Sequence, residues 1–316
     1  MSRFLARRLS FCAVLIVVAA SSALLLTRLA PGDLTTGLGP LASARDVSDA
    51  RARFGLDRPV VVQWAAWAAS AVRLDFGESF RYQQPVGPLV LAAAGNTAIL
   101  ALAALAVATI AGIGLGILTG SRRGVIPALV RGLSVAALSL PPLLTSLAML
   151  FVAARTGWFP VGGMSSIDAS LPGRWSDLAA HLPLPVLALA LPVAATFERL
   201  QSAALGEQIH QPFVAAAAAR GVPPVSLVLR HAWPVSVKSV AAIYGLAAGS
   251  LLSGSFAVES VTGWPGLGRL MYEALQARDI YLVAGCAAVG AALVSLGMLL
   301  GDVLLALSDP RVRDVA

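Results

Sequence analysis

Long apolar runs separated by short polar segments dominate the hydropathy pattern of the chain. A run of about 18 or more apolar residues with almost no charge is long enough to cross a bilayer as a helix. Six runs approach or exceed this length, although the fourth is short and interrupted by prolines. The pattern predicts an all-α polytopic membrane protein in which residues 1–316 form one transmembrane domain. The expected spans cover residues 9–29, 97–119, 133–154, 183–200, 238–258 and 281–307.

Composition supports lipid, rather than water, as the solvent for these runs. Apolar residues make up 58% of the chain and charged residues 12%, against about 45–50% and 25% in an average soluble domain. The mean hydropathy of +0.81 agrees. The formal charge is +7, but the basic residues are scattered singly between apolar runs, which argues against nucleic acid as a partner.

The basic residues also predict how the spans are oriented. Arg3, Arg7 and Arg8 precede the first run, which is longer than the apolar part of a typical signal peptide, so we expect an uncleaved anchor. Cytoplasmic segments of membrane proteins are enriched in Lys and Arg, and this rule predicts that both termini are cytoplasmic. It places residues 30–94 and 259–280 in outer loops and residues 201–237 in a cytoplasmic loop.

Small residues and prolines predict how the spans pack and bend. Small side chains that recur every fourth position let two helix backbones approach closely in lipid. Adjacent prolines should kink the third run, and further prolines should bend the fourth. The small residues are Ala108, Gly112, Gly116 and Gly120 in the second run and Gly245, Gly249 and Ser253 in the fifth, and the prolines of the third run are Pro141 and Pro142.

The chain offers little for catalysis, ion coupling or ATP binding. Asp302 is the one charged residue more than two positions from the ends of the expected spans, whereas an ion-coupled carrier should show more. Lys238, the single lysine, follows valine rather than glycine, so it cannot complete a phosphate-binding loop. We therefore expect no enzyme activity, no metal site and no cofactor in this chain. Transport powered by ATP would need an ATPase on another chain.

The cytoplasmic loop contains the most informative segment, GEQIHQPFVAAAAARGVPPVSLVLRHAWP at 206–234. Pro212 in front of the alanine-rich stretch and Gly221 behind it predict a short helix over 213–220. Its small side chains would let another protein approach the helix backbone. The alternative is an ordinary amphipathic connector on the membrane surface.

The same segment resembles the cytoplasmic E-A-A-x-x-x-G loop of ABC-importer permeases. Its first three positions fall on Ala215, Ala216 and Ala217, its glycine on Gly221 and its final proline on Pro234. Alanine replaces the acidic first position. The rest of the chain resembles the dipeptide, oligopeptide and nickel permeases of binding-protein-dependent importers, through FLARRL (4–9), APGD (30–33), GLDRP (55–59), LDFGESF (74–80), SRRG (121–124), VESVTGWPGLGRLMYEALQARD (258–279) and DPRVR (309–313).

The resemblance implies a six-span, MetI-like permease of the bacterial inner membrane that moves peptides. It further implies a homologous permease, two cassette ATPases that bind ATP and Mg, and an extracytoplasmic solute-binding protein as partners. Phe213, Ala215, Ala216, Ala217, Arg220, Gly221 and Pro234 would form the ATPase-coupling loop. Trp264, Pro265, Gly266, Leu267 and Gly268 would form an outer-face motif that receives the binding protein or anchors the chain at the lipid interface.

Other solutes and other classes of protein remain open at this point. Nickel chelates or a further solute fit the same permease fold, and the sequence identifies no substrate-contacting residue. An ion-coupled secondary carrier or a non-transporting membrane scaffold are the rival classes. Co-purification of an ATPase separates the first of these from an ABC importer.

Overall fold

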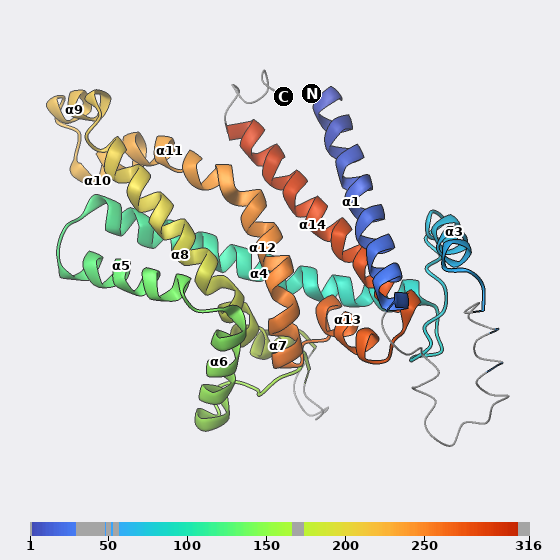
Figure 1. The fold of residues 1–316 in the computed structure, drawn as a ribbon. Coiled ribbons are helices and arrows are strands. Elements are labelled where there is room, and N and C mark those ends of the chain that lie inside the picture. The colour runs from blue at the N-terminus through green and yellow to red at the C-terminus, as the bar shows by residue number, and fades with distance from the viewer. Residues whose placement is uncertain (1, 30–47, 49–51, 53–56, 166–173, 309–316) are drawn as a thin grey trace. The chain divides into compact units, whose positions relative to one another are not determined.

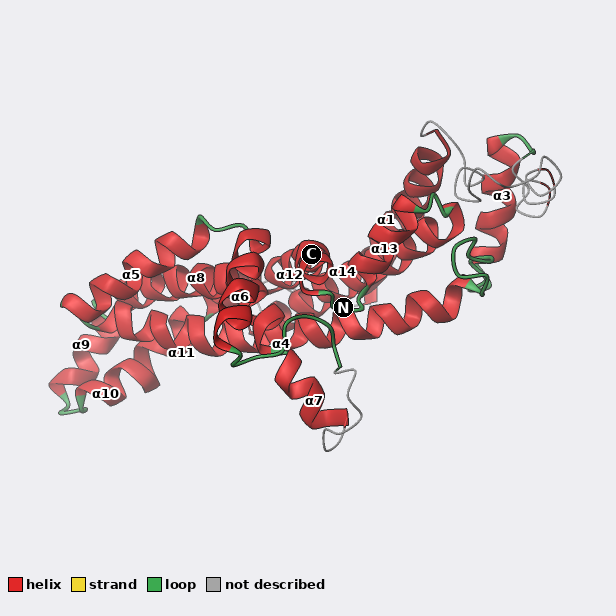
Figure 2. Ribbon diagram, turned by 90° about the horizontal axis from the view of Figure 1, so that it is seen from below, coloured by secondary structure: helices red, strands yellow, loops and turns green. Residues whose placement is uncertain are grey.

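The computed structural model describes residues 2–29, 48, 52, 57–165 and 174–308. Within them the chain is helical, and the only extended pairing is an isolated bridge between Glu78 and Pro85 (Figures 1 and 2). The predicted all-α fold class is confirmed. The sequence blocks at 30–33 and 309–313 lie outside the described residues.

Fourteen labelled helical elements follow one another in this part of the chain (Figure 1). They are α1 (Ser2–Leu29), α3 (Val60–Ala71), α4 (Val86–Ser121), α5 (Val125–Leu138), α6 (Pro142–Thr156), α7 (Arg174–His181), α8 (Pro183–Gln208), α9 (Pro212–Ala219), α10 (Pro224–Ser226), the π-helix η2 (Leu227–Ala232), α11 (Trp233–Ser236), α12 (Lys238–Thr262), α13 (Leu267–Gln276) and α14 (Ile280–Ser308).

Five of the described helices are long and apolar enough to cross a membrane, namely α1, α4, α8, α12 and α14. The pair α5 and α6 supplies a sixth span if the two are counted together, and the chain bends by 109° between them. The bend falls where the adjacent prolines predict a kink. Pro141 is extended and Pro142 opens α6, because a proline can start a helix but cannot continue one.

Two helices extend well beyond the apolar runs that predict them. α4 begins at Val86 rather than at residue 97, and α8 continues to Gln208 rather than to residue 200. Asn96 and Thr97 interrupt the apolar run in the sequence, yet both side chains find hydrogen-bond partners in the fold. Glu198 likewise interrupts the apolar run of α8, and its buried side chain accepts a hydrogen bond from Thr119.

The chain divides into two compact units. The α8 unit contains Ala98–Trp264 and Leu296–Ala316, and the α13 unit contains Ser2–Thr97 and Pro265–Ser295. α4 and α14 each contribute one part to both units.

Glycines bring α4 into backbone contact with α8 in the α8 unit. A β-carbon on Gly112 would lie 2.6 Å from the carbonyl oxygen of Ala194, and one on Gly116 would lie 2.6 Å from Cβ of Gln201. Such separations leave no room for a side chain. The small-residue stripe predicted for this span is therefore confirmed as a helix contact.

A second close contact joins α12 to the last part of α14. A β-carbon on Gly301 would lie 2.2 Å from the Cα of Gly245, so the two backbones touch. Gly249 is buried on the same helix. Ser253, the third small residue of the predicted stripe, is exposed and lies outside the contact.

A buried carboxylate organises the α13 unit. Asp279 is 1% exposed and precedes α14, where Oδ1 accepts a hydrogen bond from the backbone N–H of Leu282 at 3.2 Å. Oδ2 accepts from the hydroxyl of Ser79 at 2.6 Å and from the N–H of Arg81 at 3.1 Å. One side chain thus caps a helix and fixes a loop about 200 residues earlier in the chain.

Asp279→Ala should destabilise the α13 unit by about 3 kcal/mol, because each buried donor left without an acceptor costs about 1–3 kcal/mol and the loop can relax only in part. The thermal unfolding midpoint of the detergent-purified chain measures the effect. Asp279→Asn should lower the stability less, since one side-chain oxygen remains to accept a hydrogen bond. Asp75→Asn changes an exposed aspartate that accepts one hydrogen bond, and a loss as large as that of Asp279→Ala would refute the assignment.

Candidate functional site

The short helix predicted in the cytoplasmic loop is present as α9, at Pro212–Ala219. Pro212 opens it after an extended Gln211, and Arg220 ends it. Gly221 then adopts a φ of +82°, which side chains other than glycine tolerate poorly. The proline and glycine at its two ends therefore set the length of the helix.

The structure divides the predicted coupling residues between two faces of α9. Val214 is 5% exposed and lies in a small apolar cluster with Leu205 of α8 and Ala232 of η2, and Ala217 is 1% exposed. Phe213 is 44% exposed, and Ala215, Ala216, Arg220 and Gly221 are exposed as well. One face of α9 is thus anchored to the bundle and the other is open.

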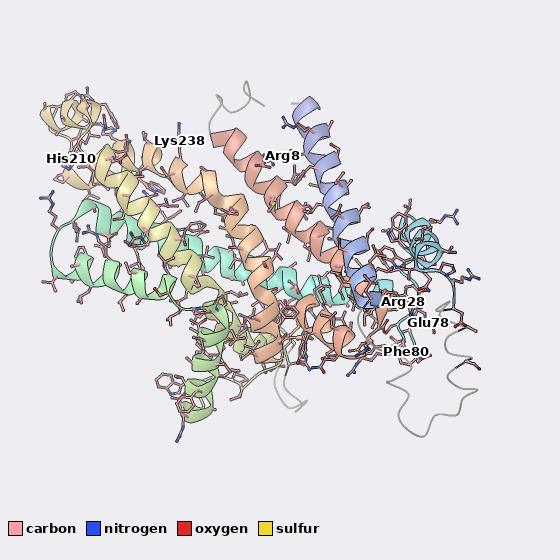
Figure 3. The ribbon with its side chains drawn as sticks, in the orientation of Figure 1. Arg8, Arg28, Glu78, Phe80, His210 and Lys238 are labelled. Atoms are coloured by element: carbon pink, nitrogen blue, oxygen red, sulfur yellow. The ribbon has the colours of Figure 1, made fainter. Side chains whose placement is uncertain are left out.

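The segment after Gly221 returns the chain to the bundle. Pro224 starts α10, η2 and α11 follow, and Pro234 is exposed near the start of α11. The side-chain amide of Gln201 in α8 donates to the hydroxyl of Ser236 at 2.7 Å. Figure 3 shows His210 and Lys238, which flank the segment, at the α9 end of the α8 unit.

A buried polar cluster beside this segment escaped the sequence analysis. Glu198 is 1% exposed in α8, and its Oε1 accepts a hydrogen bond from the hydroxyl of Thr119 at 2.5 Å. Arg131 of α5 donates to the backbone oxygen of Thr119. The spacing of two polar residues could have indicated this cluster in the sequence. Glu198 and Gln201 lie three positions apart, on the face of α8 that meets the glycines of α4.

The predicted outer-face motif is built around a turn between α12 and α13. Gly263 ends α12 with a φ of +69°. Trp264 is fully buried, so it packs inside the α8 unit and anchors neither lipid nor a partner surface. Among the other motif residues, Pro265 is exposed, Gly266 and Leu267 are buried and Gly268 is half-buried.

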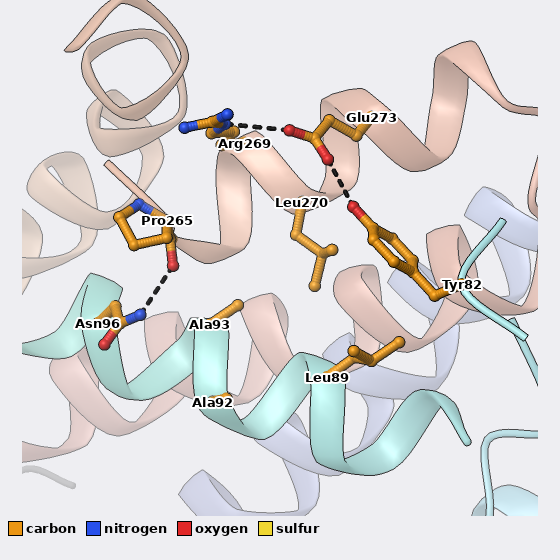
Figure 4. Close-up of a pocket in the computed structure, with 10 residues that line it drawn as sticks. Tyr82, Leu89, Ala92, Ala93, Asn96, Pro265, Arg269, Leu270 and Glu273 are labelled. Carbon is orange, nitrogen blue, oxygen red and sulfur yellow. Dashed lines mark hydrogen bonds and ion pairs between the residues drawn. The ribbon is translucent and has the colours of Figure 1, made fainter. Parts of the chain in front are cut away.

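Polar residues of α4 hold the start of α13 within the α13 unit. The amide of Asn96 donates to the carbonyl oxygen of Pro265 at 2.9 Å, and the N–H of Leu267 donates to Thr97 Oγ1 at 2.8 Å. An open pocket of about 350 Å³ lies beside these contacts, and Figure 4 shows its lining. The lining residues include Tyr82, Leu89, Asn96, Pro265, Arg269, Leu270 and Glu273.

A hydrogen-bonded chain of three side chains borders this pocket. The hydroxyl of Tyr82 donates to Glu273 Oε2 at 2.5 Å, and Arg269 Nε donates to Glu273 Oε1 at 3.0 Å (Figure 4). Burial raises the pKa of Tyr82, and the carboxylate of Glu273 raises it further. Burial alone would also raise the pKa of Glu273, but the two hydrogen bonds outweigh it and lower that pKa below its usual value. Glu273 is therefore the charged acceptor of the chain.

The contact of Glu273 with Arg269 should weaken in acid. Because the folded-state pKa of Glu273 is lowered, its stabilisation is complete above the ordinary glutamate pKa and is lost as the pH falls through the lowered value. Because the pair is partly exposed, we expect it to contribute about 0.2–1 kcal/mol to the free energy of unfolding. Unfolding midpoints of the wild type and Glu273→Gln should differ at neutral pH and converge in acid. A constant difference across that range would exclude the assignment.

Several apolar helices of membrane-spanning length, with a short half-exposed helix held between two of them, define a polytopic membrane protein of the transporter class. The chain belongs to the family described as binding-protein-dependent transport system inner membrane component, which matches residues 112–314. The matched residues include α8, the coupling segment and α12. The protein is therefore a multi-pass bacterial inner-membrane permease subunit of an ABC importer, as its sequence blocks predict.

Individual relatives match the chain over almost its whole length. A putative peptide permease protein of Brucella ovis is 34% identical over 91% of this chain and 92% of its own length. The oligopeptide transport system permease protein AppB of Bacillus subtilis is 30% identical over 90% of each chain. The oligopeptide transport system permease protein OppB of Mycobacterium tuberculosis is 31% identical over 99% of each chain.

Proposed function

We propose that this chain is one permease subunit of a peptide importer. The observation that carries the proposal is the end-to-end similarity to permease proteins named for peptides and oligopeptides, at 30–34% identity over at least 90% of both chains. A shared fold alone would not indicate the solute. Similarity over at least 90% of both chains supports a shared transport role.

The same proposal includes the partners that such a system needs. A homologous permease completes the translocation path, two cassette ATPases bind ATP and Mg, and an extracytoplasmic binding protein delivers the solute. The open face of α9, with Phe213 and Ala216 exposed, supports docking of an ATPase at this segment. Both termini and the coupling segment then lie in the cytoplasm.

Two contacts explain how a docked ATPase would move the bundle. Val214 of α9 packs with Leu205 of α8, and Gln201 joins α8 to the returning segment through Ser236. A displacement of α9 is therefore transmitted to α8, and from α8 to α4 through their glycine contact. Closure of the ATPases on ATP would drive the bundle from an inward-facing to an outward-facing state, the kind of two-state element that coupling requires.

Reconstitution of the complete transporter in proteoliposomes tests the proposal. Peptide-loaded binding protein should stimulate ATP hydrolysis and peptide accumulation, and both should stop when the ATPases are left out. Uptake that continues without the ATPases would identify a secondary carrier and overturn the proposal. Stimulation by a binding protein loaded with a nickel chelate, but not with peptides, would retain the importer and refute peptides as the solute.

A further inference from the structure

An open pocket of about 390 Å³ lies on the α8 unit, away from the coupling helix α9. Arg131 of α5 lines it together with Glu198, Arg199 and Leu200 of α8, and Ser202 and Ala203 complete the lining. α5 and α8 pack against each other. The pocket thus presents two arginines, one from each helix.

The two guanidinium groups are placed to receive an anion. Arg131 donates to the backbone oxygen of Thr119 in the last turn of α4, which restrains its side chain. Arg199 is exposed and forms no hydrogen bond or ion pair with any described residue. Arginine recognises phosphate through several N–H donors at once.

Both arginines lie at the same expected membrane boundary. The third span is expected to begin at residue 133 and the fourth to end at residue 200, close to Arg131 and Arg199 respectively. Arg122 and Arg123, both exposed, follow α4 on the same side. With these expected boundaries, the pocket would lie level with the phosphates of the lipid headgroups.

The state of Glu198 favours an anionic over a zwitterionic headgroup. One carboxylate oxygen accepts the hydrogen bond of Thr119, and the other is buried. A headgroup ammonium therefore has no exposed carboxylate to bind in the pocket, whereas its phosphate would still have two arginines.

We propose that this pocket binds the headgroup of an anionic phospholipid, with its phosphate on Arg131 and Arg199. Basic pockets between membrane helices are suited to such headgroups. The bound lipid would fill the space between α5 and α8 and hold the two helices together at the membrane surface.

The test measures lipids retained by the intact transporter from nanodiscs of phosphatidylcholine with added phosphatidylglycerol, by native mass spectrometry. Arg199→Gln should lower retention of phosphatidylglycerol about fivefold, since one arginine near a lipid surface contributes about 1 kcal/mol. Arg199 is exposed and forms no hydrogen bond or ion pair with the described residues, so this change should leave the fold intact. Arg155→Gln removes an exposed arginine of α6 that does not line the pocket, and retention should not change.

Four results would overturn the proposal. Equal retention by the wild type and Arg199→Gln would show that the pocket does not hold the lipid. Retention of phosphatidylethanolamine equal to that of phosphatidylglycerol would remove the anionic preference. Equal competition by inorganic phosphate would indicate a free-anion site. Lipid held by the isolated chain but expelled from the assembled transporter would assign the pocket to a partner subunit.

Discussion

Ala216→Glu is expected to abolish ATP-driven uptake while the chain still folds and inserts. Ala216 is exposed on α9, so the new carboxylate meets solvent in the free subunit and disturbs no internal packing. In the assembled transporter the same side chain would enter the proposed ATPase contact. Loss of a central contact residue typically costs 2 kcal/mol or more, which weakens ATPase association more than about tenfold. Co-purification of the ATPases and uptake in vesicles measure both effects.

Two neighbouring variants separate docking from folding. Ala216→Ser keeps a small side chain and should retain uptake. Ala217→Glu places a charge at a position that is 1% exposed, so it should disrupt the packing of α9 and reduce the amount of folded protein. Normal uptake by Ala216→Glu, with the ATPases bound, would exclude the open face of α9 as the docking surface.

Gly112→Ala and Gly116→Ala should each lower the stability of the α8 unit by about 1–3 kcal/mol, because overpacking a close contact costs roughly this amount. A methyl group on Gly112 would meet the carbonyl oxygen of Ala194, which belongs to the backbone and cannot swing aside. The two helices would have to separate. Thermal unfolding midpoints in detergent, together with the amount of inserted protein, report the loss.

Gly114→Ala is the matched control on the same helix. A β-carbon at this position has no neighbour within 4 Å, and alanine favours a helix over glycine by about 1 kcal/mol. This variant should be as stable as the wild type or more stable. If Gly114→Ala and Gly112→Ala lost stability equally, the close contact between α4 and α8 would not explain the loss.

Features that depend on local sequence were predictable. Apolar runs located the long helices because a bilayer demands length and hydropathy from each span by itself. Pro141 and Pro142 located the break between α5 and α6, and Pro212 with Gly221 located α9. The glycine spacing of α4 predicted a close helix contact, although it did not identify α8 as the partner.

Features that depend on distant partners were not predictable. Glu198 in the sequence signals the end of a span, yet Thr119, 79 residues earlier, supplies the hydrogen bond that lets it be buried. Asn96 likewise finds its acceptor 169 residues later. The alanines of α9 are chemically identical, so only the packing of the folded chain determines that Ala217 is buried and Ala216 is exposed.

The break between α5 and α6 constrains how the chain is made. α5 has 14 residues and α6 has 15, so at 1.5 Å per residue each is about 21–23 Å long, less than the roughly 30 Å of a bilayer core. Neither half is long enough to leave the translocon as a span of its own. If α5 and α6 form one span, the insertion machinery has to accept both halves as one segment, and a nascent chain that stops after Leu138 contains only the first half of that span.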